Sequence, residues 1–145
     1  MLPRLTNCFQ VMITKHLLVL KITLLSLAVG WTLLIAFLCL VSFSDLPSFG
    51  VSGIDKYVHF TFHFVFTLLW GFYSLTKENK IELIKILLIV AISLFFGIVI
   101  ELLQDAFTKT RHADIEDVLA NFTGAIIALV LFILLKKNKN QITTS

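Results

Sequence analysis

The sequence predicts an all-α integral membrane protein, built as a bundle of four transmembrane helices with both termini in the cytoplasm. Of its 145 residues, 58% are hydrophobic and only 14% are charged, whereas soluble domains carry roughly a quarter charged residues. Four long apolar runs alternate with short polar segments. Because backbone groups facing lipid must satisfy their own hydrogen bonds, we expect each run to be a helix.

The first apolar run, 22–43, has no charged residue and is long enough at ~1.5 Å per residue to cross a ~30 Å hydrocarbon core. It exceeds the usual apolar length of a signal peptide and lacks a cleavage site, so we expect it to be retained. The other runs, 58–75, 86–103 and 118–135, lie near the lower length limit, and flanking residues extend them. We predict helices at about 18–43, 57–75, 82–105 and 115–135, in one domain spanning 17–135. Residues 1–16 are predicted to be a cytoplasmic or interfacial tail, and 136–145 a basic cytoplasmic tail.

Positive charge is unevenly distributed between the two sides of the predicted bundle. Nine of the twelve basic residues fall on one side: Arg4, Lys15, Lys21, Lys77, Lys80, Lys85, Lys136, Lys137 and Lys139. Cytoplasmic loops of membrane proteins carry the excess of Lys and Arg, which predicts a multi-pass protein of the cytoplasmic membrane with this side inside. Seven of the nine acidic residues fall on the outer side. No basic patch interleaved with aromatic residues is present, so nucleic acid is not an expected partner.

Titratable residues mark the start of the second predicted helix. Asp55 can act as its N-cap, and His59 and His63 follow at intervals of four residues, which places the three on one face. One reading is a helix cap with interfacial histidines. In a functional reading, Asp55 or Glu101 orients His59 towards an outer pocket. Two histidines four residues apart can bind a metal, but no third matched ligand is evident, so neither metal nor cofactor is predicted.

A second polar group follows at the end of the third predicted helix. Glu101, Gln104 and Asp105 have the spacing of one helical face. Glu101 lies inside an apolar run, where an ionised carboxylate is costly unless it is paired or hydrated. The candidate partners are Lys56, His59 and Arg111. A structural ion pair between helices and a ligand site both account for this pattern.

The fourth predicted helix begins with a stripe that is polar at its outer end and small further in. Its members are Asp114, Asp117, Asn121, Gly124 or Ala125, and Ala128. Small residues let membrane helices approach closely, and an asparagine can hydrogen-bond across the contact. We therefore expect the inner half of the stripe to pack against a neighbouring helix. Arg111, just before the stripe, is expected to contact an anion, because its planar guanidinium matches carboxylate or phosphate.

Taken together, these pieces resemble the VanZ-like family of small bacterial membrane proteins. The resemblance covers about residues 55–130 and rests on Asp55-Lys56-x-x-His59-Phe60, Glu101-Leu102-Leu103-Gln104 and Arg111-x-x-Asp114-x-x-Asp117-Val118-Leu119-x-Asn121-x-x-Gly124. His63 is not part of that pattern. The resemblance implies a multi-helix membrane protein of a family named for a factor in resistance to the glycopeptide teicoplanin.

The function predicted from these observations is a non-enzymatic membrane protein with an outward-facing polar pocket. Its ligand would be an envelope molecule: a lipid headgroup, a cell-wall precursor or a glycopeptide. Three alternatives stay open: an intramembrane enzyme with His59 as base and Glu101 or Asp117 as its partner, a small transporter component, and a purely structural cluster. Residues predicted to line or brace the pocket are Asp55, Lys56, His59, Glu101, Gln104, Arg111, Asp114, Asp117 and Asn121.

Overall fold

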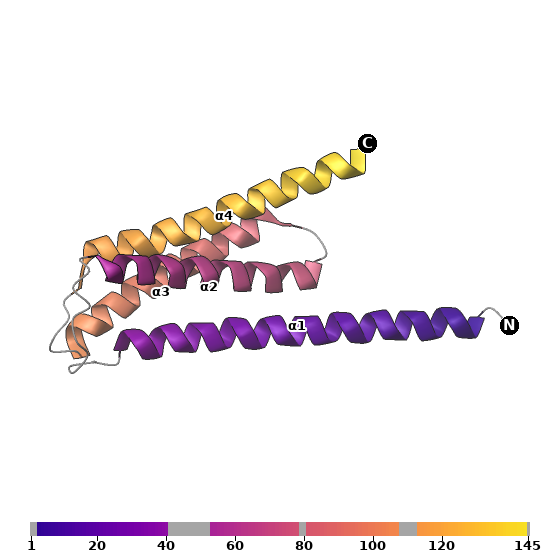
Figure 1. Cartoon of the computed structure of the whole chain (residues 1–145), viewed down its shortest axis with the longest axis horizontal. Helices are drawn as coiled ribbons and strands as arrows, with labels where there is room; N and C mark the ends of the chain where they lie inside the picture. Colours follow the sequence, from indigo (N-terminus) through magenta and orange to yellow (C-terminus); the bar gives the residue numbers. More distant parts are fainter. Residues whose placement is uncertain (1–2, 41–52, 79–80, 108–112, 145) are drawn as a thin grey trace.

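The computed structural model describes residues 3–40, 53–78, 81–107 and 113–144, and all of its regular structure is helical. Four helices follow one another along the chain: α1 (Pro3–Leu40), α2 (Ile54–Glu78), α3 (Leu83–Phe107) and α4 (Ile115–Thr144). They run alongside one another as a bundle, from which the N-terminal part of α1 extends alone (Figure 1). The predicted all-α fold with four helices is therefore confirmed.

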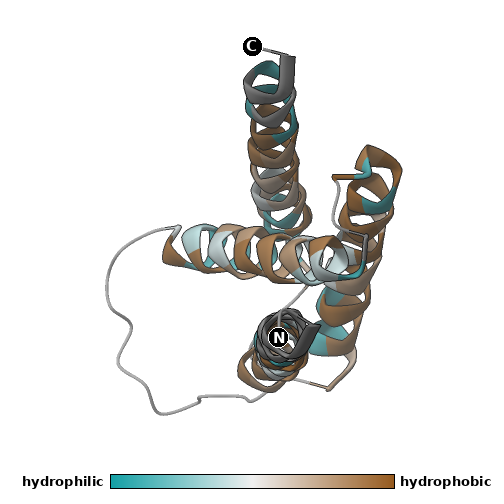
Figure 2. Ribbon diagram, turned by 90° about the vertical axis from the view of Figure 1, so that its right-hand side faces the viewer, coloured by the Kyte–Doolittle hydropathy of each residue, from teal (hydrophilic) through white to brown (hydrophobic). Residues whose placement is uncertain are grey.

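Each helix contains an apolar segment long enough to cross a bilayer. The four segments are Thr14–Leu40, Ile54–Lys77, Leu83–Phe107 and Ile115–Asn138. Hydrophobic residues dominate along the helices in these segments (Figure 2). Many large apolar side chains point away from the bundle, including Leu33 at 65% and Phe95 at 68% exposure. Such surfaces are suited to contact with lipid, and the chain is a multi-pass membrane protein.

Two helices are longer than the apolar runs that predicted them. α1 begins at Pro3 instead of near residue 18, and α4 continues to Thr144 through the basic segment. Proline is favoured at the first helical position, and neither Gly nor Pro follows it until Gly30. Hydropathy indicates which part of a helix crosses a membrane, whereas the ends of a helix are indicated by helix-breaking residues and capping residues. Residues 41–43 of the first predicted helix lie outside the described residues.

Local caps explain where α2 and α4 begin. The side chain of Asp114 caps α4, since its Oδ1 accepts a hydrogen bond from the backbone N–H of Glu116 at 2.8 Å. α2 begins at Ile54, directly after Gly53, whose φ of +86° favours glycine. The predicted N-cap role of Asp55 is therefore wrong: this residue lies in the first turn of α2, where its carboxylate still suits the helix dipole.

The small stripe of α4 is buried in helix packing, as predicted, and its closest approach is to α2. Asn121, Ala125 and Ala128 are each no more than 1% exposed. At Gly124 the two helices approach so closely that an added Cβ would overlap the backbone oxygen of Phe60 in α2. Deeper in the bundle, this contact continues into an apolar core formed by Ile86, Val90, Ala125, Leu129 and Phe132.

Helix α1 contacts α2 and α3 but no described residue of α4. Polar side chains contribute to this contact as well as apolar ones. The indole N–H of Trp31 donates to the carbonyl of Phe62 at 3.0 Å, and that of Trp70 donates to Thr32 Oγ1 at 3.2 Å. In a bilayer, hydrogen bonds between helices contribute about 0.6 kcal/mol each on average. The attachment of α1 thus depends on several weak contacts.

A second close approach joins Gly71 of α2 and Phe132 of α4, and it leaves no room for a side chain at position 71. A Cβ at position 71 would overlap the ring of Phe132, which is itself fully buried. We expect Gly71→Ala to lower the free energy of unfolding by about 1–3 kcal/mol, the usual effect of overpacking. Thermal unfolding in detergent measures this, and Phe132→Leu in the same chain should restore part of the loss. A midpoint for Gly71→Ala equal to that of the wild type would contradict the prediction.

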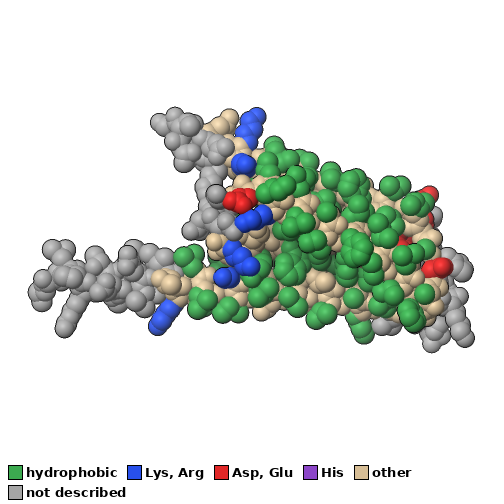
Figure 3. All heavy atoms as spheres, turned by 180° about the vertical axis from the view of Figure 1, so that it is seen from behind, with side chains coloured by type: hydrophobic (Ala, Val, Ile, Leu, Met, Phe, Trp, Pro, Cys, Tyr) green, Lys and Arg blue, Asp and Glu red, His purple; other side chains and the backbone are tan. Residues whose placement is uncertain are grey.

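Charge is segregated between the two ends of the bundle. Figure 3 shows a band of apolar side chains with Lys and Arg gathered at one end and acidic side chains at the other, apart from one acidic group near the basic end. Near the basic end, Glu82 pairs with Lys85 at 3.1 Å. The assignment of the basic end to the cytoplasm stays a prediction from the positive-inside rule.

Candidate functional site

Four polar side chains from three helices meet near the acidic end of the bundle. His59 comes from α2, Glu101 from α3, and Asp117 and Asn121 from α4. We call these four residues the polar cluster. His59 and Asn121 are separated by 62 positions in the sequence. The structure thus brings together, from the second, third and fourth helices, four of the nine residues predicted to line or brace the pocket.

His59 lies at the centre of the polar cluster and is only 3% exposed. Its Nδ1 lies 3.2 Å from Asn121 Oδ1. Because an amide oxygen only accepts hydrogen bonds, this contact places a proton on Nδ1. Glu101 Oε1 lies 3.5 Å from the same nitrogen, and Asp117 Oδ2 lies 3.7 Å from Nε2. The imidazole is therefore held by Asn121 and flanked by two carboxylates.

Several polar atoms of the polar cluster have no hydrogen-bond partner among the described residues. They include Glu101 Oε1, Asp117 Oδ1 and Asn121 Nδ2. Glu101 is 2% exposed, and its other oxygen accepts a bond from the backbone N–H of Asp114 at 3.4 Å. An unsatisfied buried polar group costs about 1–3 kcal/mol, and native structures contain few of them. Three such atoms within one cluster point to a site that interacts with something outside the four helices.

Partly exposed charges form a rim beside the polar cluster. Lys56 Nζ lies 2.9 Å from Glu116 Oε2 and 3.6 Å from Asp114 Oδ2. Lys56 was one of the partners expected for Glu101, but it pairs with the acidic start of α4 instead. Exposed pairs of this kind contribute about 0–1 kcal/mol, so the rim adds little to stability. Glu116 was not predicted as a site residue; its position in the first turn of α4, opposite the start of α2, is the signal that was missed.

Other predicted site residues lie away from the polar cluster. Gln104 is buried and donates to the carbonyl of Cys39 at 2.8 Å, so it binds α3 to α1. Asp105 is exposed and accepts a hydrogen bond from the N–H of Ala113. Asp55 is exposed. Arg111, expected to contact an anion, lies outside the described residues. The shared helical spacing of Glu101, Gln104 and Asp105 therefore did not bring them to one site, because different neighbouring helices surround them.

His63 has a structural environment distinct from that of His59. Its Nδ1 lies 2.8 Å from Ser93 Oγ, and it is 1% exposed. Its ring centroid lies 6.2 Å from those of Phe66 and Phe96. The sequence reading of His63 as an interfacial histidine did not predict this burial between helices. The two histidines of α2 thus do not form a paired site, since each faces its own polar partners.

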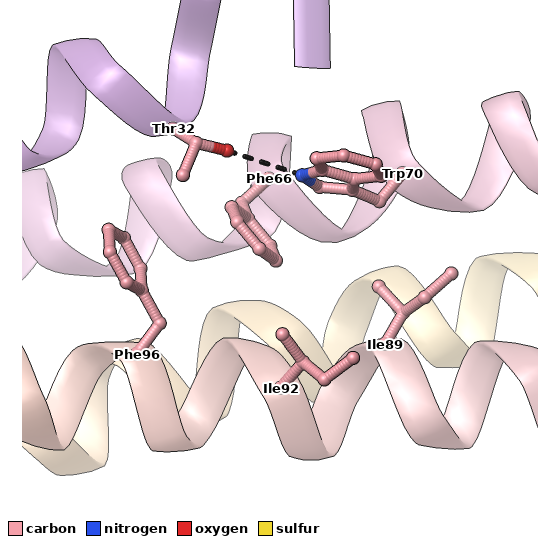
Figure 4. Close-up of a pocket in the computed structure, with 6 residues that line it drawn as sticks. All are labelled: Thr32, Phe66, Trp70, Ile89, Ile92 and Phe96. Carbon is pink, nitrogen blue, oxygen red and sulfur yellow. Dashed lines mark hydrogen bonds between the residues drawn. The ribbon is translucent and has the colours of Figure 1, made fainter. Parts of the chain in front are cut away.

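An apolar cavity, which the sequence did not predict, opens between α1, α2 and α3 within the spanning segments. Its volume is about 260 Å³. The aromatic side chains point into the space between the helices, and the bond from Trp70 to Thr32 closes one side (Figure 4). It is lined by Thr32, Phe66, Trp70, Ile89, Ile92 and Phe96.

The chemistry of the polar cluster and its rim is dominated by acceptors. Glu101, Asp117, Asp114 and Glu116 supply carboxylates, and Lys56 is the one cation among the described residues that contact them. A carboxylate–histidine pair is also adequate for general-base work. Among the described residues, however, the polar contacts of His59 are carboxylates and an amide, with no hydroxyl or thiol to activate.

Comparison with known families identifies the chain. A model of the VanZ/LLP1 family matches residues 7–136, most of the sequence. The chain belongs to the VanZ/LLP1 family. This confirms the resemblance carried by the segments around His59, Glu101 and Asp117. No curated protein and no solved structure shows a significant match to this VanZ/LLP1 protein.

Proposed function

We propose that this VanZ/LLP1 membrane protein binds an envelope molecule through the polar cluster and its rim. The supporting observation is the set of buried polar atoms without partners on α3 and α4, above all Glu101 Oε1 and Asp117 Oδ1. A purely structural cluster would be expected to satisfy its own members, since unsatisfied buried groups oppose folding. Here the acceptors are held in place by the helices and remain available to a ligand.

The residues also indicate the ligand's chemistry. Carboxylates and the amide oxygen of Asn121 accept hydrogen bonds, so they favour a head group that donates, through hydroxyl or ammonium groups. Amino-phospholipids, cell-wall precursors and glycopeptides all carry such donors. Because the acidic end is predicted to face outward, the site would meet these molecules at the outer surface of the cytoplasmic membrane.

The apolar cavity supports an amphiphilic ligand. Its lining residue Phe66 follows His59 on α2 by seven positions, about 10 Å along the helix axis at ~1.5 Å per residue. Both features use α2 and α3, and the cavity lining is apolar apart from Thr32. A head group at the polar cluster and an apolar chain nearer the centre of the membrane would suit these two environments.

Binding to purified protein tests the proposal. The full chain in detergent, with EDTA present, is incubated separately with phosphatidylethanolamine, a lipid-linked cell-wall precursor and teicoplanin, and retention is quantified by native mass spectrometry. We expect the wild type to retain at least one of them. Asp117→Asn should weaken retention about 10–100-fold, as expected for loss of a charged hydrogen bond worth ~1.5–3 kcal/mol.

The matched control is Lys85→Gln, which changes a charge at the opposite end of the bundle. This variant should retain the ligand as the wild type does. Failure of the wild type to retain any of the three molecules would contradict the proposal. Equal retention by Asp117→Asn and the wild type would also contradict it, because the polar cluster would then have no part in binding.

A further inference from the structure

We infer that His59, Glu101 and Asp117 form a binding site for a divalent transition-metal ion. Each offers one ligand atom, and these atoms all lie within 4.8 Å of one another. The three residues come from three different helices, so the fold itself creates the arrangement. This site coincides with the proposed envelope-binding region, but the metal requires no envelope ligand, and the two proposals can fail separately.

The distances suit a shared ion better than direct pairing. Glu101 Oε1 lies 3.5 Å from His59 Nδ1 and Asp117 Oδ2 lies 3.7 Å from Nε2, both too long for good hydrogen bonds, whereas one ligand atom from each residue lies within 4.8 Å of the others. Two ligand atoms each about 2.1 Å from one ion lie ~3.4 Å apart at a tetrahedral angle and at most ~4.2 Å apart. Side-chain movements of a few tenths of an ångström would bring all three atoms within that limit.

Glu101 gives an independent indication of a ligand. Glu101 is only 2% exposed, yet its Oε1 accepts no hydrogen bond from any described residue. Asp117 is less deeply buried, but its Oδ1 also has no hydrogen-bond partner among the described residues. Lys56, the nearest described cation, is engaged by Glu116 and Asp114 at the rim. Two carboxylates in an apolar bundle call for positive charge, and a divalent cation supplies it at the position where they converge.

Asn121 would act as a positioning residue. Its Oδ1 accepts the proton of His59 Nδ1 at 3.2 Å, which leaves Nε2 with its lone pair facing Asp117. Metal-binding histidines commonly donate their other ring N–H to an acceptor in this way, which fixes the tautomer and the ring orientation. One imidazole with two carboxylates favours ions such as Zn²⁺ or Mn²⁺ over Mg²⁺, which prefers oxygen ligands and retains its water.

Zinc titration of the full chain tests the inference. The purified protein in detergent, stripped with EDTA and free of added lipid, is titrated with Zn²⁺ in competition with a chromophoric chelator. We expect one saturable site. Asn121→Ala, which removes a residue that positions His59, should weaken Zn²⁺ binding about 10–100-fold. Glu101→Gln and Asp117→Asn, which remove ligands, should each weaken Zn²⁺ binding by at least as much. Circular dichroism reports whether each variant is folded.

Asp55→Asn is the matched control, because it removes the same charge from an exposed position at the same end of the bundle, away from the proposed ligands, and it should bind Zn²⁺ as the wild type does. If Glu101→Gln fails to fold, Asp117→Asn, at the more exposed edge of the cluster, decides the matter. Absence of saturable Zn²⁺ binding in the wild type would overturn the inference, as would unchanged binding in Asp117→Asn. Saturable binding of Mg²⁺ alone would overturn the assignment to a transition metal. Zinc binding without retention of any envelope molecule would leave this site standing and contradict the proposed function.

Discussion

Replacing Gly124 with alanine is expected to separate α2 from α4 and destabilise the whole bundle. The new Cβ would overlap the backbone oxygen of Phe60 and lie 3.0 Å from the backbone nitrogen of Phe64. Backbone atoms within a helix cannot move aside as a flexible side chain can, so the helices themselves must shift. We expect the free energy of unfolding to fall by about 3 kcal/mol, the upper end of ordinary overpacking.

Thermal unfolding of the purified protein in detergent, followed by circular dichroism, measures this effect. Gly30→Ala is a matched control in α1, because a Cβ at that position meets nothing within 4 Å. That variant should be unchanged or more stable, since alanine is favoured over glycine in helices by about 1 kcal/mol. Equal midpoints for the Gly124 and Gly30 variants would show that the close approach of α2 and α4 is not required.

Removing the imidazole of His59 should have a comparable effect through electrostatics. His59→Leu leaves Glu101 and Asp117 without their shared neighbour. A buried polar group left without its partner costs about 1–3 kcal/mol, and more if it is charged, because the carboxylates then stay buried without compensation. The same change would also abolish the proposed Zn²⁺ site. Unfolding midpoints in detergent provide the measurement.

The double variant His59→Leu/Glu101→Leu separates this cause from a simple loss of packing. It removes the more deeply buried carboxylate as well, so it should be more stable than His59→Leu alone. His16→Leu, at an exposed position of α1, is the control and should behave as the wild type. If the double variant proves less stable than His59→Leu, uncompensated charge is not the source of the loss.

The general architecture was predictable from the sequence. Hydropathy located the membrane-crossing segments because an uninterrupted apolar run in lipid has few alternatives to a helix. The packing role of the stripe from Asn121 to Ala128 was also predictable, because small residues on one face of a helix allow a neighbouring helix to approach closely. The start of α1 at Pro3 and the end of α4 at Thr144 were harder to predict, since hydropathy does not indicate where the polar part of a helix begins or ends.

The candidate site was predictable only in outline. Chain topology was enough to bring His59 and Glu101 to one end of the bundle, because α2 starts where α3 finishes. Helical spacing then grouped Glu101 with Gln104 and Asp105, yet Gln104 turns to α1 and bonds Cys39. Spacing within one helix specifies a face, but it does not specify which neighbouring helix covers each part of that face.

The sequence by itself determined a membrane bundle of four helices with its acidic groups collected at one end, because hydrophobicity and charge are local properties of the chain. Only the tertiary structure decided which acidic groups share a histidine. It placed Glu101 and Asp117 beside the same imidazole, that of His59, and assigned Lys56 to the rim with Glu116. These choices depend on how the helices rotate about their axes, and that rotation is set by close contacts such as Gly124 against the backbone of α2.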